Sequence, residues 1–136
     1  MPSIFTKIIA GEIPGEFVFR DNLWVAILDI TPVSPGHALL IPTVEAQYLA
    51  DVPGPAMAVL GDRLARLMAA VRSASGASDV CVLLKDGPAA GQVVPHVHIH
   101  VFPRFPGDNK HLGWPAAPYA DGDLKVWAAK VRSAWR

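Results

Sequence analysis

Three histidines alternate with apolar residues in one short segment, and their side chains are the best candidates for chemistry. They are His96, His98 and His100, three of the five histidines in the chain. Because side chains alternate across an extended strand, a strand here would point all three imidazoles to one face, about 7 Å apart. The spacers, such as Val97 and Ile99, would point to the opposite face, toward a core. Chance explains three histidines in strict alternation poorly.

One chemistry that suits such an array is metal binding, since imidazoles at positions i and i+2 can share an ion. A catalytic zinc site also needs carboxylates or carbonyls that orient its ligands. Binuclear hydrolases with alternating histidines usually continue into an Asp-His pair, whereas His100 is followed by Val-Phe-Pro. This weakens the metal hypothesis without excluding it.

The second chemistry is nucleophilic attack on phosphorus, in which an imidazole nitrogen forms a covalent phosphoramidate. The reaction needs neighbours that orient the nucleophile, protonate the leaving group and bind the non-bridging oxygens. His96 and His100 flank His98, and the loop from Gly87 to Gly91 can offer backbone N–H groups to an anion. A glycine-rich loop beside a histidine segment therefore favours phosphorus chemistry.

The elements that must position these residues follow from hydrophobic periodicity and turn signals. Ser3 can cap a short helix that Gly11 ends, and a long amphipathic helix is predicted from about Pro55 to Gly76. Strands are predicted at residues 16–20, 24–28, 37–41, 80–84 and 97–102. We expect Cys81, inside one of these strands, to be a buried and inert thiol. A final amphipathic helix from about residue 123 is expected to dock on its own domain rather than on a membrane.

Length, charge and cysteine content limit the possible classes of protein. A chain of 136 residues is expected to form one domain with a core that needs no staples. Twelve basic and twelve acidic residues argue against a broad electrostatic surface for nucleic acid or an anionic membrane. A single cysteine excludes an internal disulfide and favours the cytoplasm. No membrane span or export signal is expected.

Taken together, these residues resemble the histidine triad (HIT) superfamily, whose signature is His-x-His-x-His with apolar spacers. The resemblance covers residues 3 to about 104. Residues 4–14 and 28–42 are similar to the Hint branch, and the loop at 86–92 is similar to the Fhit branch.

The resemblance implies a role for each matching position. His98 would be the nucleophile, His100 would contact the phosphate and help the leaving group depart, and His96 and His37 would support them. Asp29 would hold the ribose hydroxyls, although an aspartate here could equally cap the following turn. The apolar positions around the purine, most of which could also be plain core, are Ile4, Phe5, Ile8, Ile13, Ile27 and Ile30. The positions on the phosphate side are Lys85, Gly91, Gln92 and Val93.

The chain departs from the family at several positions. Lys85 replaces a neutral Asn or Gln near the phosphate, and it could reach the phosphate or point to solvent. Val93 replaces a Ser or Thr, so one hydrogen bond to the phosphate would be lost. Ser3 and Thr6 stand where some bacterial relatives have a Cys-x-x-Cys zinc site, and Val44 or Glu45 stands where a histidine often follows, so no metal is expected there.

The fold that the resemblance implies is α+β, with an antiparallel, meander-like sheet and one long helix packed on it. A short N-terminal helix and a C-terminal helical tail complete it. We expect a HIT domain over residues 1–104 and a tail over 105–136 that docks on it. A homodimer whose sheets join is expected, and Trp114 of the tail would reach the partner's active site.

The leading hypothesis is hydrolysis or transfer at the α-phosphorus of a nucleotide conjugate, through a nucleotidyl-His98 intermediate that releases AMP. The conjugate could be an adenosine phosphoramidate, an aminoacyl-adenylate or a dinucleoside polyphosphate. No cofactor is required, although a polyphosphate substrate can arrive with Mg²⁺. The alternatives are a purine-nucleotide-binding module with weak catalysis, to which Lys85 and Val93 would contribute, and a histidine-ligated metalloenzyme.

Overall fold

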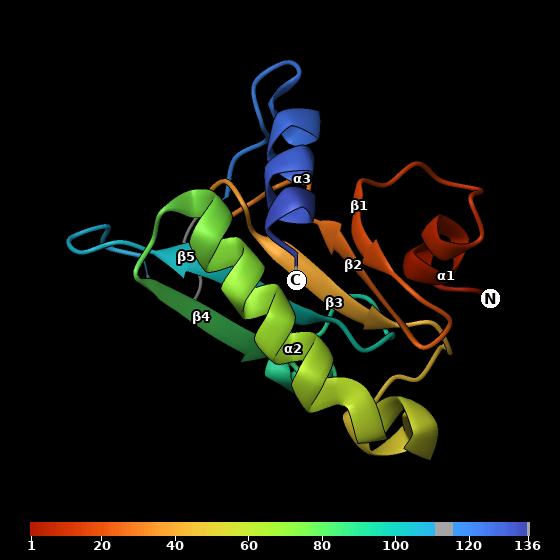
Figure 1. Cartoon of the computed structure of the whole chain (residues 1–136). Helices are drawn as coiled ribbons and strands as arrows, with labels where there is room; N and C mark the ends of the chain where they lie inside the picture. The colour runs from red at the N-terminus through yellow and green to blue at the C-terminus, as the bar shows by residue number, and fades with distance from the viewer. Residues whose placement is uncertain (111–115, 136) are drawn as a thin grey trace.

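A five-stranded antiparallel sheet forms the centre of the computed structural model, which describes residues 1–110 and 116–135 (Figure 1). Its strands are β1 (Phe17–Arg20), β2 (Trp24–Leu28), β3 (Ala38–Pro42), β4 (Asp79–Leu84) and β5 (Ile99–Arg104). The order across the sheet is β1-β2-β3-β5-β4. The first three strands form a meander, and β5 inserts between β3 and β4, which leaves β4 at an edge. The predicted α+β architecture is confirmed.

The sheet carries a core on each face. The helices are α1 (Ile4–Ile9), α2 (Gly54–Ser75) and α3 (Asp123–Ala134), with short 3₁₀ turns at Leu49–Asp51 and Pro88–Ala90. Leu40 of β3 points to the face covered by α2 and α3, which cross in front of the sheet in Figure 1. Its neighbour Leu39 points to the other face, where it packs with Phe5 and Ile8 of α1. The candidate site lies on this second face.

The long helix α2 begins and ends where the sequence signals place it. Pro55 lies in its first turn, and Gly76 follows its last residue with φ at 75°. A glycine adopts this left-handed conformation at little cost, and its N–H donates to the Arg72 carbonyl at 3.1 Å. Leu67 and Val71 of the predicted apolar stripe are fully buried. The helix therefore packs on the sheet, as its periodicity predicts.

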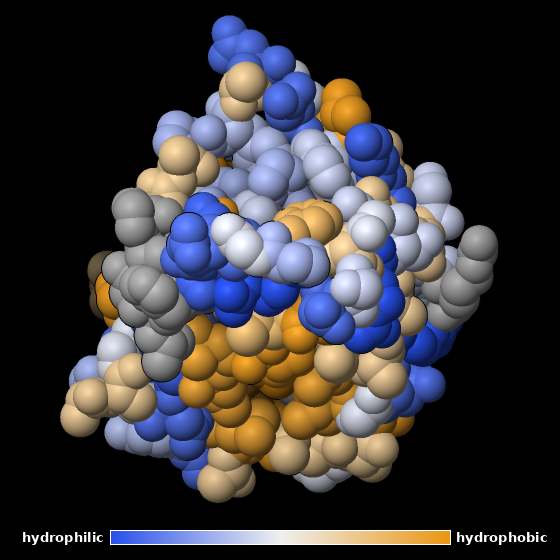
Figure 2. Space-filling model, turned by 90° about the vertical axis from the view of Figure 1, so that its left-hand side faces the viewer, coloured by the Kyte–Doolittle hydropathy of each residue, from blue (hydrophilic) through white to orange (hydrophobic). Residues whose placement is uncertain are grey.

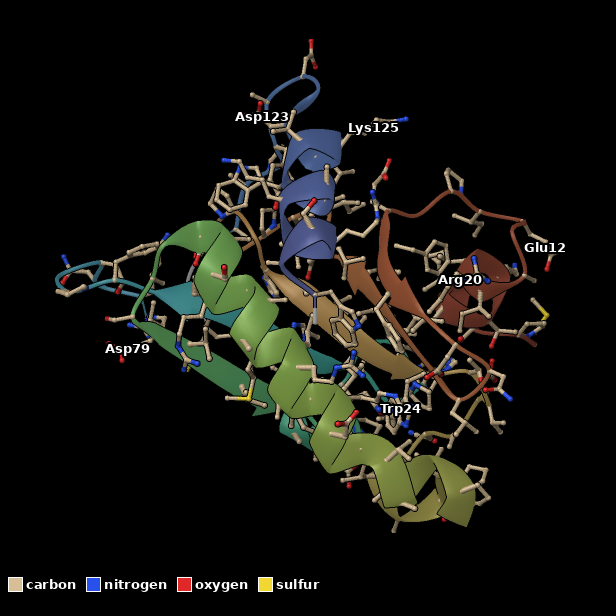
Figure 3. The ribbon with its side chains drawn as sticks, in the orientation of Figure 1. Glu12, Arg20, Trp24, Asp79, Asp123 and Lys125 are labelled. Atoms are coloured by element: carbon tan, nitrogen blue, oxygen red, sulfur yellow. The ribbon has the colours of Figure 1, made fainter. Side chains whose placement is uncertain are left out.

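The tail helix α3 packs against α2 and β1. Asp123 and Lys125 mark its first turn, at the top of Figure 3. At the other end, Trp135 stacks on Phe19 with ring centroids 4.2 Å apart, and Arg132 donates to the Phe17 carbonyl.

None of the helices in the described ranges is long and apolar enough to cross a membrane. The boundary between a 1–104 domain and a 105–136 tail stays a prediction.

The predicted strand at 97–102 is displaced, because β5 begins only at Ile99. The ladder with β4 starts here, because Ile99 pairs with Leu84, the last residue of β4; on the other side, the pairing with β3 begins at Leu40. His96 and His98 therefore precede the strand, and only His100 lies within it. The expectation of three imidazoles along one strand is wrong in this respect, although the apolar spacers do enter the core.

Cys81 is half-buried rather than buried. It lies in β4, whose residues are exposed or only partly buried along the whole strand. The apolar run predicts a strand correctly, but it does not predict that the strand is at an edge of the sheet.

Candidate active site

The partners of His98 fix which of its nitrogens is free. Its Nδ1 lies 2.7 Å from the backbone carbonyl of His96. A carbonyl only accepts hydrogen bonds, so Nδ1 carries the proton and Nε2 keeps its lone pair. Burial lowers the pKa of His98 below its usual value, which favours this neutral form. The neutral imidazole therefore has an unprotonated Nε2, which is the form that a nucleophile needs.

His96 lies behind His98 and is fully buried. Its Nε2 donates to the Pro42 carbonyl at 2.9 Å, so its Nδ1 must accept, and the partner is the Ser3 hydroxyl at 2.7 Å. The Phe5 ring contacts both imidazoles, with centroids 5.9 Å from His96 and 4.9 Å from His98. His96 therefore holds the backbone that orients His98.

A second chain of hydrogen bonds orients His100. The backbone N–H of Val33 donates to Nδ1 of His37 at 3.0 Å, so the proton of neutral His37 is on Nε2. That Nε2–H donates to Nδ1 of His100 at 2.9 Å. A neutral His100 then carries its own proton on Nε2. The centroid of its ring lies 5.2 Å from that of His98, so the two imidazoles are neighbours.

Burial keeps both members of this pair neutral. Desolvation lowers the pKa of His37 to about 4, although the nearby Asp29 carboxylate opposes the shift. Desolvation, together with the neighbouring imidazoles His37 and His98, lowers the pKa of His100 to about 4. The pair is therefore neutral at pH 7.

An apolar cavity of about 280 Å³ opens in front of these imidazoles. Its walls come from α1, the following loop, and strands β2 and β3. The lining side chains named by the sequence analysis are Ile4, Phe5, Ile8, Ile13, Ile27, Asp29, Ile30, His98 and His100. Ile30 is two-thirds exposed and lies at the rim. A small, mostly apolar cavity with a few polar groups at one end is typical of a ligand site.

Asp29 caps the turn, which is one of the two alternatives that the sequence leaves open, and it also lies at the cavity. Its Oδ1 accepts from the Thr31 backbone N–H at 2.9 Å and from the Thr31 hydroxyl at 3.2 Å, which caps the turn. The same residue lines the cavity, and its Oδ2 lies 3.7 Å from Nε2 of His37.

The residues predicted on the phosphate side do not line the cavity. Lys85 lies over Gly91, where an added Cβ would stand 3.2 Å from its Cδ. Gln92 is buried and donates its amide to the Gln47 carbonyl at 2.8 Å. Val93 is 90% exposed. The predicted Trp114 contact lies outside the described residues.

A polar network, missed by the sequence analysis, ties α1 to the histidines. The Glu45 carboxylate accepts from the Ser3 backbone N–H at 2.7 Å and from the Thr6 hydroxyl at 2.6 Å. These hydrogen bonds, that of Thr6 first, lower the pKa of Glu45. The Ser3 hydroxyl in turn donates to His96. This network of Ser3, Thr6 and Glu45, which we call the Glu45 latch, joins the helix to the site. From the sequence, Ser3, Thr6 and Val44 or Glu45 stand out only as departures from the family pattern, and their interaction is not predicted.

Asp29, His37 and His100 are the described residues that could hold a metal ion, with one ligand atom each within 4.8 Å of the others. The fit is poor in this arrangement. Two nitrogens on one tetrahedral zinc ion lie about 3.3 Å apart, whereas His37 Nε2 and His100 Nδ1 are 2.9 Å apart. A shared proton suits this distance better than an ion.

Comparisons with known proteins place the chain in a family. Residues 10–107 match the HIT domain model. An uncharacterized HIT-like protein of Mycobacterium tuberculosis is 41% identical over 98% of this chain and 93% of its own length. An adenosine 5′-monophosphoramidase of Schizosaccharomyces pombe is 34% identical over 98% of both chains. An adenylylsulfatase of Arabidopsis thaliana is 37% identical over 74% of this chain and 51% of its own length.

Solved structures of HIT proteins have the same fold as this chain. A HIT-like protein involved in cell-cycle regulation from Bartonella henselae superposes with a TM-score of 0.86 at 30% identity, over 97% of this chain and 95% of that one. The site geometry, the matching domain model and these relatives together lead to one conclusion: the chain belongs to the histidine triad family.

Proposed function

We propose that this protein hydrolyses nucleotide conjugates at the α-phosphorus and releases AMP, with His98 as the nucleophile. The observation that carries the proposal is the unprotonated Nε2 of His98, an imidazole that lines the apolar cavity. The relatives named as an adenylylsulfatase and an adenosine 5′-monophosphoramidase support a nucleotide conjugate as the substrate.

In the first step, the nucleoside occupies the cavity and Asp29 accepts hydrogen bonds from the ribose hydroxyls. The lone pair of His98 Nε2 forms a bond to the α-phosphorus. The bond from phosphorus to the leaving group breaks, and its electron pair stays with the leaving atom. His100 donates its Nε2 proton where the leaving atom needs one. The His96 carbonyl, bonded to Nδ1–H, stabilises the positive charge that develops on His98.

In the second step, water attacks the phosphorus of the nucleotidyl-histidine. The phosphorus–nitrogen bond breaks, His98 recovers its lone pair, and AMP leaves. His100 accepts a proton from this water if it has donated its own to the leaving group; otherwise that proton passes to the solvent. Two easier displacements thus replace one difficult one.

We further propose that the protein acts as a homodimer joined through β4. Among the described residues, β4 pairs with one strand only, so its outer backbone groups are free to pair with a second copy. Val82 on this strand is 40% exposed. Figure 2 shows a broad hydrophobic area on the side of the molecule that carries β4. An apolar edge strand of this kind suits a sheet that continues into an identical partner.

AMP release from adenosine phosphoramidate, adenosine 5′-phosphosulfate and diadenosine tetraphosphate tests the proposal, with wild type and His98→Ala assayed side by side, with and without EDTA. We expect turnover that survives EDTA and is lost in His98→Ala. AMP binding without turnover of any substrate would contradict the enzyme and indicate a binding module. Adenosine phosphoramidate is not a polyphosphate and does not arrive with Mg²⁺. If EDTA abolished its turnover, the protein would be a metalloenzyme instead.

A further inference from the structure

Lys85 is a charged side chain outside the cavity lining, on the sheet face of the candidate site, and the proposed mechanism gives it no role. It follows the last residue of β4, and Leu84 there pairs with Ile99 of β5. Leu83 pairs with His100, and since side chains alternate, Lys85 continues on the same face as Leu83 and His100. The sheet therefore directs this lysine toward the imidazoles.

The position of Lys85 differs from that of the nucleoside cavity. The cavity lies over β2 and β3, with Ile27 and Leu39 in its wall, on one side of β5. Lys85 extends from β4, on the other side of β5, and its side chain lies over Gly91. A phosphorus atom held by His98 would thus have its nucleoside on one side and Lys85 on the other. The part of the substrate on the lysine side is the leaving group with the phosphate oxygens.

The charge of Lys85 is not neutralised within the described part of the chain. None of the described carboxylates comes within 4 Å of its ammonium group. The adjacent Asp86 is engaged elsewhere, because it accepts from the Leu49 backbone N–H at 2.8 Å. Burial is the main cause that lowers the pKa values of His98 and His100, and the charge of Lys85 adds the smallest contribution in the same direction.

We propose that Lys85 makes this site select nucleotide conjugates whose leaving group is an anion, such as sulfate or phosphate. The inference rests on the proposed function and names its substrate class. When the bond between phosphorus and the leaving oxygen breaks, the electron pair adds negative charge to that oxygen. An ammonium group beside it stabilises this charge, and sulfate then needs no proton from His100. An amine leaving group develops no such anion and gains little from the lysine.

Steady-state kinetics of Lys85→Gln with two substrates tests the selectivity. The substrates are adenosine 5′-phosphosulfate, whose leaving group is an anion, and adenosine phosphoramidate, whose leaving group is neutral. We expect kcat/KM for the phosphosulfate to fall roughly 10- to 100-fold, the range of a hydrogen bond to a charged group. The phosphoramidate value should change less than about threefold. Lys125→Gln removes an equal charge from an exposed side chain on α3 and should change neither value.

An equal loss for both substrates would overturn the proposal, because the lysine would then serve the shared phosphate. No loss for either would overturn it as well. A binding measurement separates this inference from the proposed hydrolysis, since it needs no turnover. ADP carries a second phosphate in the position of the leaving group. Calorimetry should therefore show that wild type binds ADP more tightly than AMP. Lys85→Gln should bind ADP and AMP with equal affinity. Equal binding of ADP and AMP to wild type would contradict the role of Lys85 even if hydrolysis is confirmed.

Discussion

A hydrogen-bond partner sets the tautomer of each imidazole in the site, that is, which ring nitrogen carries the proton. The carbonyl of His96 places the proton of His98 on Nδ1, and the N–H of Val33 places that of His37 on Nε2. The lone pair on His98 and the proton on His100 follow from these two backbone groups. The alternation of histidines predicts which residues act, but their tautomers depend on loops that only the structure brings together.

The buried histidines predict that the protein loses stability in mild acid. The pKa of His37 is about 4 in the folded protein and near 6.5 in the unfolded chain. As pH falls below 6.5, the unfolded chain therefore binds a proton that the folded protein binds only near pH 4. His37 alone should lower the free energy of unfolding by on the order of 3 kcal/mol over this window. His100 should add to the loss, since its pKa is also about 4.

Urea unfolding of wild type and His37→Gln at several pH values between 7.5 and 4.5 checks this prediction. The glutamine variant is expected to depend less steeply on pH, because it lacks one titrating group and relieves His100 of a neighbouring imidazole. Carboxylates titrate in both proteins, so they cancel in the difference. Parallel curves for the two proteins would contradict the account.

At the scale of elements, α1 depends on contacts with the rest of the protein. It has six residues, and a helix this short is not stable alone. Phe5 and Ile8 hold one side of it in a small core, and the Glu45 latch holds its N-terminal end. Because the same helix lines the cavity, the latch should set how well the nucleotide is bound.

We expect Glu45→Ala to raise KM for the nucleotide substrate about three- to tenfold, because it removes two hydrogen bonds to a carboxylate that is partly exposed. Hydrogen exchange of the α1 amides should become faster in this variant. Glu12→Ala, on the exposed loop after α1, removes an equal charge and is the matched control. Unchanged KM and unchanged exchange in Glu45→Ala would show that apolar contacts alone hold the helix.

The sequence predicts most elements to within two residues, and it fails where a partner segment decides. Residues 24–28 and the end of α2 at Gly76 follow from local apolar patterns and turn chemistry. The start of β5 does not, because it depends on where β4 ends at Leu84. The exposure of Cys81 is missed for a similar reason, since strand order across the sheet is not a local property. Glu45 is missed because its partners Ser3 and Thr6 lie about 40 residues away.

For the molecule as a whole, the exposed edge strand β4 predicts that the protein forms a dimer. We expect a dimer in solution by light scattering after size exclusion, because β4 has free backbone groups beside exposed Val82. Val82→Lys should yield monomers, since a charge on this strand would be buried at the joint. Val126→Lys on α3, where Val126 is 52% exposed, is the control and should remain dimeric. A monomeric wild type at micromolar concentration would contradict the prediction.

Rapid quenching followed by intact-mass spectrometry tests whether His98 forms a covalent bond to the nucleotide. Protein mixed with excess adenosine phosphoramidate and quenched within the first turnover should gain the mass of one adenylyl group. Peptide mapping should place that group on His98, and His98→Ala should show no gain. Turnover by wild type with no covalent species at any quench time, or an adduct on a different residue, would contradict the account.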